Sequence, residues 1–332
     1  MQHAPSASLF DRPTQHRRRN ARICARAALA ALLLGLAMSP RPSAGFEQRQ
    51  MAHDGWARPY QLQRPPQLDP AHPVPLVLVL HGAGGGGARA LSSYRWDEAA
   101  ERHGFVAVAP DAMPAFPDQP AQFLANPRYW NDGRAGGPAA HQQIDDVGFI
   151  AALIDRLAGD LPIDRQRIYV TGFSSGAGMT YRLGLDLADR LAAIAPISGQ
   201  GFGARPPARP LPVLYLVGDQ DPLTPLAGGP VRLPWGTVQD HPPARKLPDT
   251  WAMLDHCQGK PSIEAPQPQV TLERWHGCAG NAEVLFYTVA GLGHEWAGGR
   301  GRLLPEAMTG PYTDAVDVTD LVWNFFRRHR LE

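Results

Sequence analysis

Short, unbroken apolar runs are the feature that most constrains how this chain can fold. Half-exposed strands alternate apolar and polar residues, whereas strands of a parallel sheet that is covered on both faces do not. The runs therefore predict buried strands of a mostly parallel sheet. The predicted strands are residues 76–80 (LVLVL), 105–109 (FVAVA), 168–171, 192–197, 213–217 and 284–289.

Several of the segments between these strands, and the end of the chain, show helical periodicity. Strands that alternate with helices favour a doubly wound α/β fold, in which helices cover both faces of the sheet. Three segments rich in proline and glycine, 110–141, 199–212 and 222–248, are predicted to be long loops that build the functional site. The predicted helices, in which apolar residues recur every three or four positions, are 89–103, 144–157, 176–189 and 317–328.

The first 44 residues differ in composition from the rest of the chain. They hold seven arginines against one aspartate, and the five arginines between positions 17 and 26 directly precede an apolar run over 27–38. This order is typical of a secretory signal peptide, and the run is shorter than the roughly 20 apolar residues of a membrane-spanning helix. We predict cleavage near Ala44, a secreted or periplasmic protein without a membrane anchor, and one domain over 45–332. Whether Arg18-Arg19 directs twin-arginine export stays open.

The composition of the remaining chain limits the kind of partner it can bind. Beyond residue 44 there are 25 basic and 30 acidic side chains, a net charge of −5. A nucleic-acid-binding protein needs a basic face, so we expect no nucleic-acid partner. The whole chain is 44% apolar with 34 Gly and 34 Pro, which suits a globular fold with many turns and excludes a collagen or a coiled coil.

The segment 167–181, RIYVTGFSSGAGMTY, places a serine between a predicted strand and a predicted helix. Gly172 and Gly176 flank Ser174 in the pattern G-x-S-x-G, which in this context forms the sharp turn called a nucleophile elbow. Only small residues at these two positions let the strained turn pack against neighbouring chain. We therefore expect Ser174 to be a nucleophile at the carboxyl edge of the sheet, and the alternative is a serine that only caps the helix.

A nucleophilic serine needs a histidine to take its proton and a carboxylate to fix the tautomer of that histidine. In this fold the three follow in the order serine, acid, histidine. Asp221, in the loop after the strand at 213–217, is the predicted acid, and Asp219 is the reserve. His294, in the glycine-rich loop after the strand at 284–289, is the predicted base. A turn-capping aspartate and a solvated loop histidine are the alternatives.

Acyl transfer also needs N–H donors for the oxyanion that forms on the substrate. The expected donors are the backbone N–H of Ser175 and one from the loop 81–87 (HGAGGGG), with Ala83 favoured over Gly84. The same loop matches the dinucleotide fingerprint G-x-G-x-x-G. However, the acid expected about 20 residues further on comes late, at Asp111 behind a proline, which argues against NAD. We expect no cofactor.

Cys257 follows His256, and Cys278 lies two positions after His276, so the four side chains could be written as a zinc site. Removal of the signal peptide would remove Cys24 and leave one cysteine pair in an oxidising compartment, where a disulfide needs no further ligand. We therefore predict a Cys257–Cys278 disulfide and no metal. By loop-closure entropy it should stabilise the loop that leads to His294 by a few kcal/mol.

Together these motifs resemble the secreted polyhydroxybutyrate depolymerases and feruloyl-esterase-like α/β-hydrolases. The resemblance covers nearly all of the chain beyond the signal peptide, and it implies the α/β-hydrolase fold and a serine esterase. The matching segments are LVLVLHG at 76–82, RIYVTGFSSGAGMTYRL at 167–183 and GHEWAGG at 293–299, the paired cysteines, and shorter stretches within 54–62, 129–132 and 145–149.

The resemblance assigns roles to individual positions. Ser174, Asp221 and His294 match the nucleophile, the acid and the base of the family, and Ala83 and Ser175 match its two oxyanion donors. A further pair, the tryptophans at positions 130 and 296, matches aromatic positions near the family's site.

Trp130 and Trp296 are therefore expected to contact substrate, with ordinary packing of large rings as the alternative. Two departures from the family pattern stand out. Ala297 replaces a usual proline, which loosens the loop after the predicted base, and one helix ends the chain without the appended binding domain of many polymer depolymerases.

The sequence thus predicts a secreted serine esterase that works through an acyl-enzyme on Ser174. Its expected substrates are hydroxyalkanoate oligomers or polymer of the polyhydroxybutyrate type, with feruloyl or acetyl esters of plant polysaccharide as the alternative. A peptidase is less favoured, and a catalytically silent ligand-binding α/β protein is the alternative outside the enzymes. Without an adsorbing domain, soluble oligomers should be hydrolysed faster than polymer film.

Overall fold

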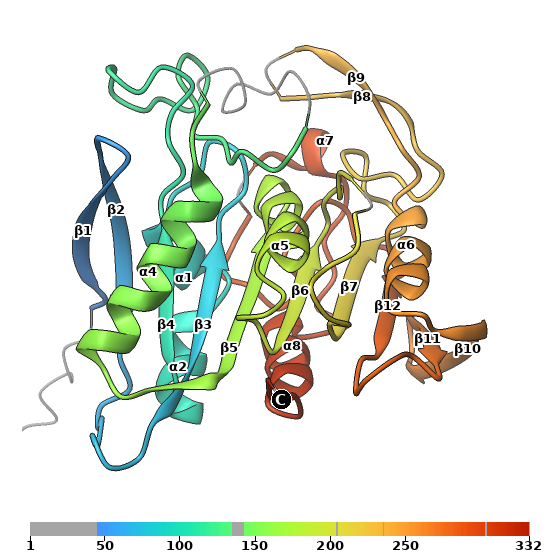
Figure 1. Cartoon of the computed structure of the whole chain (residues 1–332). Helices are drawn as coiled ribbons and strands as arrows, with labels where there is room; N and C mark the ends of the chain where they lie inside the picture. The colour runs from blue at the N-terminus through green and yellow to red at the C-terminus, as the bar shows by residue number, and fades with distance from the viewer. Residues whose placement is uncertain (1–44, 135–142, 204, 235, 303, 332) are drawn as a thin grey trace, which may run out of the picture. The chain divides into compact units, whose positions relative to one another are not determined.

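The chain folds around one large, mostly parallel sheet (Figure 1). A computed structural model describes residues 45–134, 143–203, 205–234, 236–302 and 304–331. From Phe46 onward, the described residues form one compact unit. The predicted signal peptide lies outside the described residues.

The main sheet has ten strands in the order β1-β2-β4-β3-β5-β6-β7-β12-β11-β10. The central strands from β4 to β12 run parallel, and antiparallel pairs add the strands at both edges. The bounds are β1 Glu47–His53, β2 Trp56–Gln63, β3 Val74–Leu80, β4 Val106–Pro110, β5 Ile163–Phe173, β6 Ala193–Ile197, β7 Val213–Gly218, β10 Gln258–Gln267, β11 Val270–His276 and β12 Val284–Val289.

Helices cover both faces of this sheet. In Figure 1, α4, α5 and α6 lie on the near face, while α1, α2 and α8 lie on the far face. The small sheet of β8 (Gly229–Arg232) and β9 (Val238–His241) stands beyond the carboxyl ends of the central strands. The helices are α1 Gly87–Ser93, α2 Trp96–His103, α4 Asp146–Asp160, α5 Ser175–Asp186, α6 Lys246–Leu254, α7 Glu306–Thr309 and α8 Val318–Phe326.

Two apolar cores account for the lack of an alternating pattern in the predicted strands. Leu76, Leu78 and Leu80 of β3 pack with the helices of the near face, whereas Val77 and Val79 pack with those of the far face. Successive side chains of a strand point to opposite faces, so both sets must be apolar. The six predicted strands are the parallel centre of the sheet, and the predicted doubly wound α/β fold is confirmed.

Two segments differ from their predicted structure. The single helix predicted over 89–103 is divided into α1 and α2 by Arg95, whose φ is 63°. The Arg95 guanidinium, bonded to Glu98 and Asp317, stabilises this bend. The segment 222–248, predicted to be a loop, contains β8, β9 and the start of α6.

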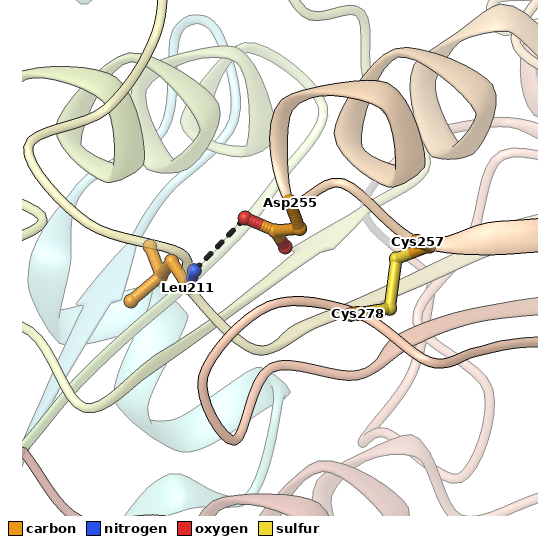
Figure 2. Close-up of a disulfide and its surroundings, with 4 residues drawn as sticks. All are labelled: Leu211, Asp255, Cys257 and Cys278. Atoms are coloured by element: carbon orange, nitrogen blue, oxygen red, sulfur yellow. Dashed lines mark hydrogen bonds between the residues drawn. A yellow bond between two sulfur atoms is a disulfide. The ribbon is translucent and has the colours of Figure 1, made fainter.

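A disulfide joins Cys257 to Cys278, as predicted (Figure 2). It spans 21 positions and closes the base of the β10–β11 hairpin, so loop-closure entropy should stabilise the fold by about 3 kcal/mol. Its predicted effect on the loop before His294 was wrong, because Cys278 precedes β12 whereas His294 follows its far end. The disulfide also uses the two sulfur atoms that the alternative zinc site would need as thiolate ligands.

Two questions about the described part of the chain are whether it holds a cluster of metal-ligating side chains and whether a helix could span a membrane. Within the described ranges, no three His, Cys, Asp or Glu side chains gather in a way that could hold a metal ion. Across the same residues, no helix is both long and apolar enough to cross a bilayer.

A fully buried carboxylate, Asp255, lies near the disulfide (Figure 2). Its Oδ1 accepts the backbone N–H of Leu211 at 3.0 Å, and its Oδ2 has no partner among the described residues. Burial raises the pKa of Asp255 from 3.8 to about 7, against the bond from Leu211 and the charge of Arg209, which lower it. The folded protein therefore holds a proton that the unfolded chain releases.

Because only the folded state keeps this proton, we expect the free energy of unfolding to fall as the pH rises from about 5 to 7. The fall should be no more than about 1.4 kcal/mol per pH unit. Asp255→Asn cannot ionise and should lack this part of the pH dependence. Asp249→Asn, an exposed change on α6, should keep it. Urea titrations at pH 5, 6 and 7 measure how the free energy of unfolding changes with pH in the unmodified protein and in both variants. Equal slopes for Asp255→Asn and the unmodified protein would contradict the assignment.

Candidate active site

Ser174 occupies the turn between β5 and α5 in a strained backbone conformation. Its φ is 57° and its ψ is −118°, and residues other than glycine seldom adopt a positive φ. The backbone N–H of Ser174 donates to the carbonyl of Ile197 at the end of β6. Its side chain makes no hydrogen bond that caps α5, so the alternative of a merely capping serine is not what the structure shows.

The glycines around Ser174 are places where backbone approaches backbone. A Cβ on Gly176 would lie 2.3 Å from the carbonyl oxygen of Leu80, and one on Gly199 would lie 2.2 Å from that of Ser174. A Cβ on Gly172 would lie 2.4 Å from the carbonyl oxygen of Gly176. The strand, the elbow and the helix are therefore in contact without intervening side chains, which holds Ser174 in place.

Asp221 and His294 form a buried pair at the carboxyl ends of β7 and β12. Nδ1 of His294 lies 2.8 Å from Oδ2 of Asp221 and 3.0 Å from Oδ1. Since an ionised carboxylate only accepts, Nδ1 carries the proton and Nε2 keeps a free lone pair. Oδ1 also accepts the backbone N–H groups of Leu223 and Thr224, each at 2.8 Å. These bonds orient the carboxylate toward the imidazole.

Asp219, the reserve acid, has a different partner. Its Oδ1 accepts the N–H of Gly291 at 2.7 Å in an exposed position. It therefore ties the loop after β7 to the loop after β12. Of the two aspartates, Asp221 is the one that the structure brings to His294.

Two backbone N–H groups near Ser174 are available to a ligand. Those of Ala83 and Ser175 have no acceptor among the described residues. Gly84, the alternative donor, is already bonded, because its N–H donates to the carbonyl of Arg128 at 2.9 Å. Ala83 thus suits the role of second oxyanion donor better than Gly84.

His81 holds the loop that carries Ala83, a role the sequence did not reveal. Its Nε2 accepts the N–H of Ala112, so Nδ1 carries the proton and donates to the carbonyl of Gly82 at 2.7 Å. Burial lowers the pKa of His81 to about 4, which keeps the ring neutral. Trp130 Nε1 donates to the carbonyl of His81 at 2.8 Å. The histidine directly after a buried strand was the only signal of this role in the sequence.

The two predicted substrate-binding tryptophans lie in different surroundings. Trp130 is buried with part of its surface on the cavity beside Ser174. Trp296 is not among the residues that line this cavity, and it stacks on Tyr94 with ring centroids 4.5 Å apart. Its Nε1 donates to the hydroxyl of Thr319. Trp296 therefore packs behind Tyr94, which does line the cavity, and the described geometry gives it the packing role named as the alternative.

A cavity of about 760 Å³ lies over these residues. Ser174, His294 and the loop of Ala83 line it, together with parts of the three long segments that were predicted to build the site. No hydrogen bond joins the side chains of Ser174 and His294 among the described residues, as is common in free enzymes. Asp111, considered above as a ribose-binding acid, instead accepts the N–H of Gly87 at 2.6 Å.

Comparison with known proteins gives relatives for most of the chain. The putative esterase NocK of Nocardia uniformis subsp. tsuyamanensis is 31% identical over 305 residues, which cover 83% of this chain and 79% of that protein. Feruloyl esterase B of Piromyces equi is 32% identical over 162 residues, 47% of this chain and 30% of that protein. No family model matches the chain.

A solved structure supports the fold. The acetyl xylan esterase from Aspergillus awamori matches with a TM-score of 0.56 and 16% sequence identity, over 85% of this chain and 99% of that chain. At this level of identity the likeness concerns the fold. It agrees with the doubly wound sheet described above.

The close contact at Gly176 predicts a large loss of stability on adding one methyl group. Gly176→Ala should lower the free energy of unfolding by about 3 kcal/mol or more, because the Cβ would strike the backbone of β3. Gly159→Ala on α4 is the matched control, since its Cβ would meet nothing within 4 Å. It should gain up to about 1 kcal/mol from helix propensity. Urea denaturation compares the two, and equal midpoints would contradict the prediction.

Proposed function

The chain belongs to the esterase family of these relatives and is a carboxylic-ester hydrolase, and we propose that Ser174, Asp221 and His294 are its catalytic triad. The observation that carries the proposal is the strained serine on the same cavity as a buried carboxylate–imidazole pair. A histidine whose Nδ1 faces a carboxylate presents Nε2 as a base, which is what a serine nucleophile requires.

The first half of the reaction forms an ester with the enzyme. Ser174 Oγ attacks the carbonyl carbon of the substrate while His294 Nε2 takes the hydroxyl proton. The negative charge on the carbonyl oxygen is stabilised by the free N–H groups of Ala83 and Ser175. The intermediate then expels the alcohol, which receives the proton from His294. The acyl group remains on Ser174.

The second half removes the acyl group with water. His294 takes a proton from the water molecule, whose oxygen attacks the acyl carbon, and the same two N–H groups stabilise the second oxyanion. The bond to Ser174 breaks, and the serine oxygen recovers the proton from His294. The products are a carboxylic acid and the unchanged enzyme, and the steps need no cofactor.

We propose an aromatic acyl ester of the feruloyl type as the preferred substrate. Phe123, Tyr129 and Phe202 line the cavity and give it aromatic surface against which the ring of such an ester can pack. Asp132 and Gln200 on the same wall offer polar atoms for ring hydroxyl groups. The name of the Piromyces relative, feruloyl esterase B, supports this choice.

Hydroxyalkanoate oligomers are the second candidate, and a different observation favours them. Phe116 and Leu124 are exposed on the loop after β4, and Phe123 of the same loop lines the cavity. An apolar rim next to the site suits an aliphatic polyester chain. We also propose that the protein is exported, because the arginine-rich, apolar N-terminus is followed by a domain with a disulfide.

A panel of soluble esters distinguishes the two substrate classes. If the proposal holds, kcat/KM for methyl ferulate should exceed that for a hydroxybutyrate trimer, because only the aromatic acyl group can stack in the cavity. The reverse order would select hydroxyalkanoates. Hydrolysis of a polymer film at the rate per enzyme seen on trimers would contradict the expected preference for soluble substrates.

Ser174→Ala should abolish ester hydrolysis and covalent labelling by a fluorophosphonate, because it removes the only atom that attacks the ester. Ser175→Ala is the matched control. It keeps the backbone N–H and removes a buried hydroxyl that has no partner among the described residues, so it should retain most activity. Labelling that survives Ser174→Ala would show that another residue is the nucleophile.

Asp221→Asn should lower kcat by roughly 10⁴, because the amide favours the wrong tautomer of His294. Asp219→Asn still offers an oxygen to the N–H of Gly291 and should change kcat by less than about threefold, as expected for a residue outside the triad. Steady-state kinetics on p-nitrophenyl acetate measure both. A larger loss for Asp219→Asn would mean that the acid is misassigned.

A further inference from the structure

A second histidine, His241, lies on the cavity wall at the end of β9. Its side chain is buried, with 9% of the residue exposed. Nδ1 lies 3.0 Å from the carbonyl oxygen of Leu223, and Nε2 has no partner among the described residues. Because a carbonyl oxygen only accepts, Nδ1 carries the proton. Burial, together with the nearby guanidinium of Arg134, lowers the pKa of His241 and favours the neutral ring.

The carbonyl that accepts this bond belongs to the peptide that holds the acid. The carbonyl of Leu223 and the N–H of Thr224 are the two ends of one planar peptide unit. That N–H donates to Oδ1 of Asp221 at 2.8 Å, and Oδ2 of Asp221 faces Nδ1 of His294. A continuous path of hydrogen bonds thus leads from one imidazole through a peptide and a carboxylate to the other imidazole.

We propose that His241 is a positioning residue for the proposed triad, and that it acts by orienting the Leu223–Thr224 peptide against Asp221. The inference rests on the proposed function. A hydrogen bond to the carbonyl fixes the plane of the peptide and polarises its N–H, which strengthens the bond to the carboxylate. The Thr224 hydroxyl donates to the carbonyl of Ser198, so the turn after Asp221 has a second support. Loss of His241 should therefore weaken the orientation of Asp221 without abolishing it.

The burial of His241 argues against a role in packing alone. An imidazole whose Nε2 is buried without a partner costs more to desolvate than an apolar side chain of similar size. Among the described residues, the side-chain bond that offsets this cost is the bond from Nδ1 to the Leu223 carbonyl. β9 is part of the small sheet at the edge of the cavity, so the position of this sheet is linked to the orientation of the acid.

Two variants separate the donor from the bulk of the side chain. His241→Leu keeps volume without a donor, and His241→Asn places an amide N–H near the position of Nδ1. On p-nitrophenyl acetate, His241→Leu should lower kcat about tenfold, the value of one hydrogen bond, with KM changed less than twofold. His241→Asn should recover at least half of kcat. Equal losses in both variants, or no loss in His241→Leu, would overturn the proposal.

A double-mutant cycle tests the route of the effect. If His241 acts through Asp221, adding His241→Leu to Asp221→Asn should cause little further loss in kcat. A further tenfold loss would overturn the proposal, because it would show a route that bypasses the acid. Thermal denaturation verifies that each variant is folded. If Asp221→Asn alone leaves kcat unchanged, the proposed triad fails instead, so the two failures are distinguishable.

Discussion

The strained turn at Ser174 is the constraint on which the rest of the site depends. A positive φ at a serine persists only where the surrounding backbone leaves it no alternative. Gly172 and Gly176 supply that restraint, because each touches backbone where any side chain would collide. Gly199, at the end of β6, closes the turn from the other side. The sheet therefore holds the turn of Ser174 rigidly. Its parallel centre also brings the carboxyl ends of β5, β7 and β12 to one edge.

The loops that carry the acid, the base and the oxyanion donors are held by hydrogen bonds between side chains and backbone groups. Asp221 accepts two N–H groups from its own turn, and Asp219 ties that turn to the loop of His294. The loop of the oxyanion donors is held in the same manner by His81. These directed bonds let short loops at different strand ends keep a common geometry. His241 extends the arrangement to the small sheet beside the cavity.

Much of the fold was readable because the central strands are buried on both faces. Burial on both faces requires an unbroken apolar run, and β12 was predicted from such a run with its observed bounds. The edge strands β1 and β10 carry mixed, exposed residues and gave no comparable signal. The bend at Arg95 was also hidden, since its stabilising partner Asp317 is far away in the chain. Local pattern cannot report a contact between distant segments.

For the site, the residue types and their order could be read from the sequence: a serine in an elbow, an acid after one strand and a histidine after another. It favoured Asp221 as the acid and kept Asp219 in reserve, because the two share a loop and a residue type. The folded structure shows that Asp221 faces His294, whereas Asp219 accepts a backbone N–H. It likewise placed Trp296 behind Tyr94 and away from the cavity. Neither could be read from the sequence, because hydrogen bonds and burial depend on positions in space that residues far apart in the chain set together.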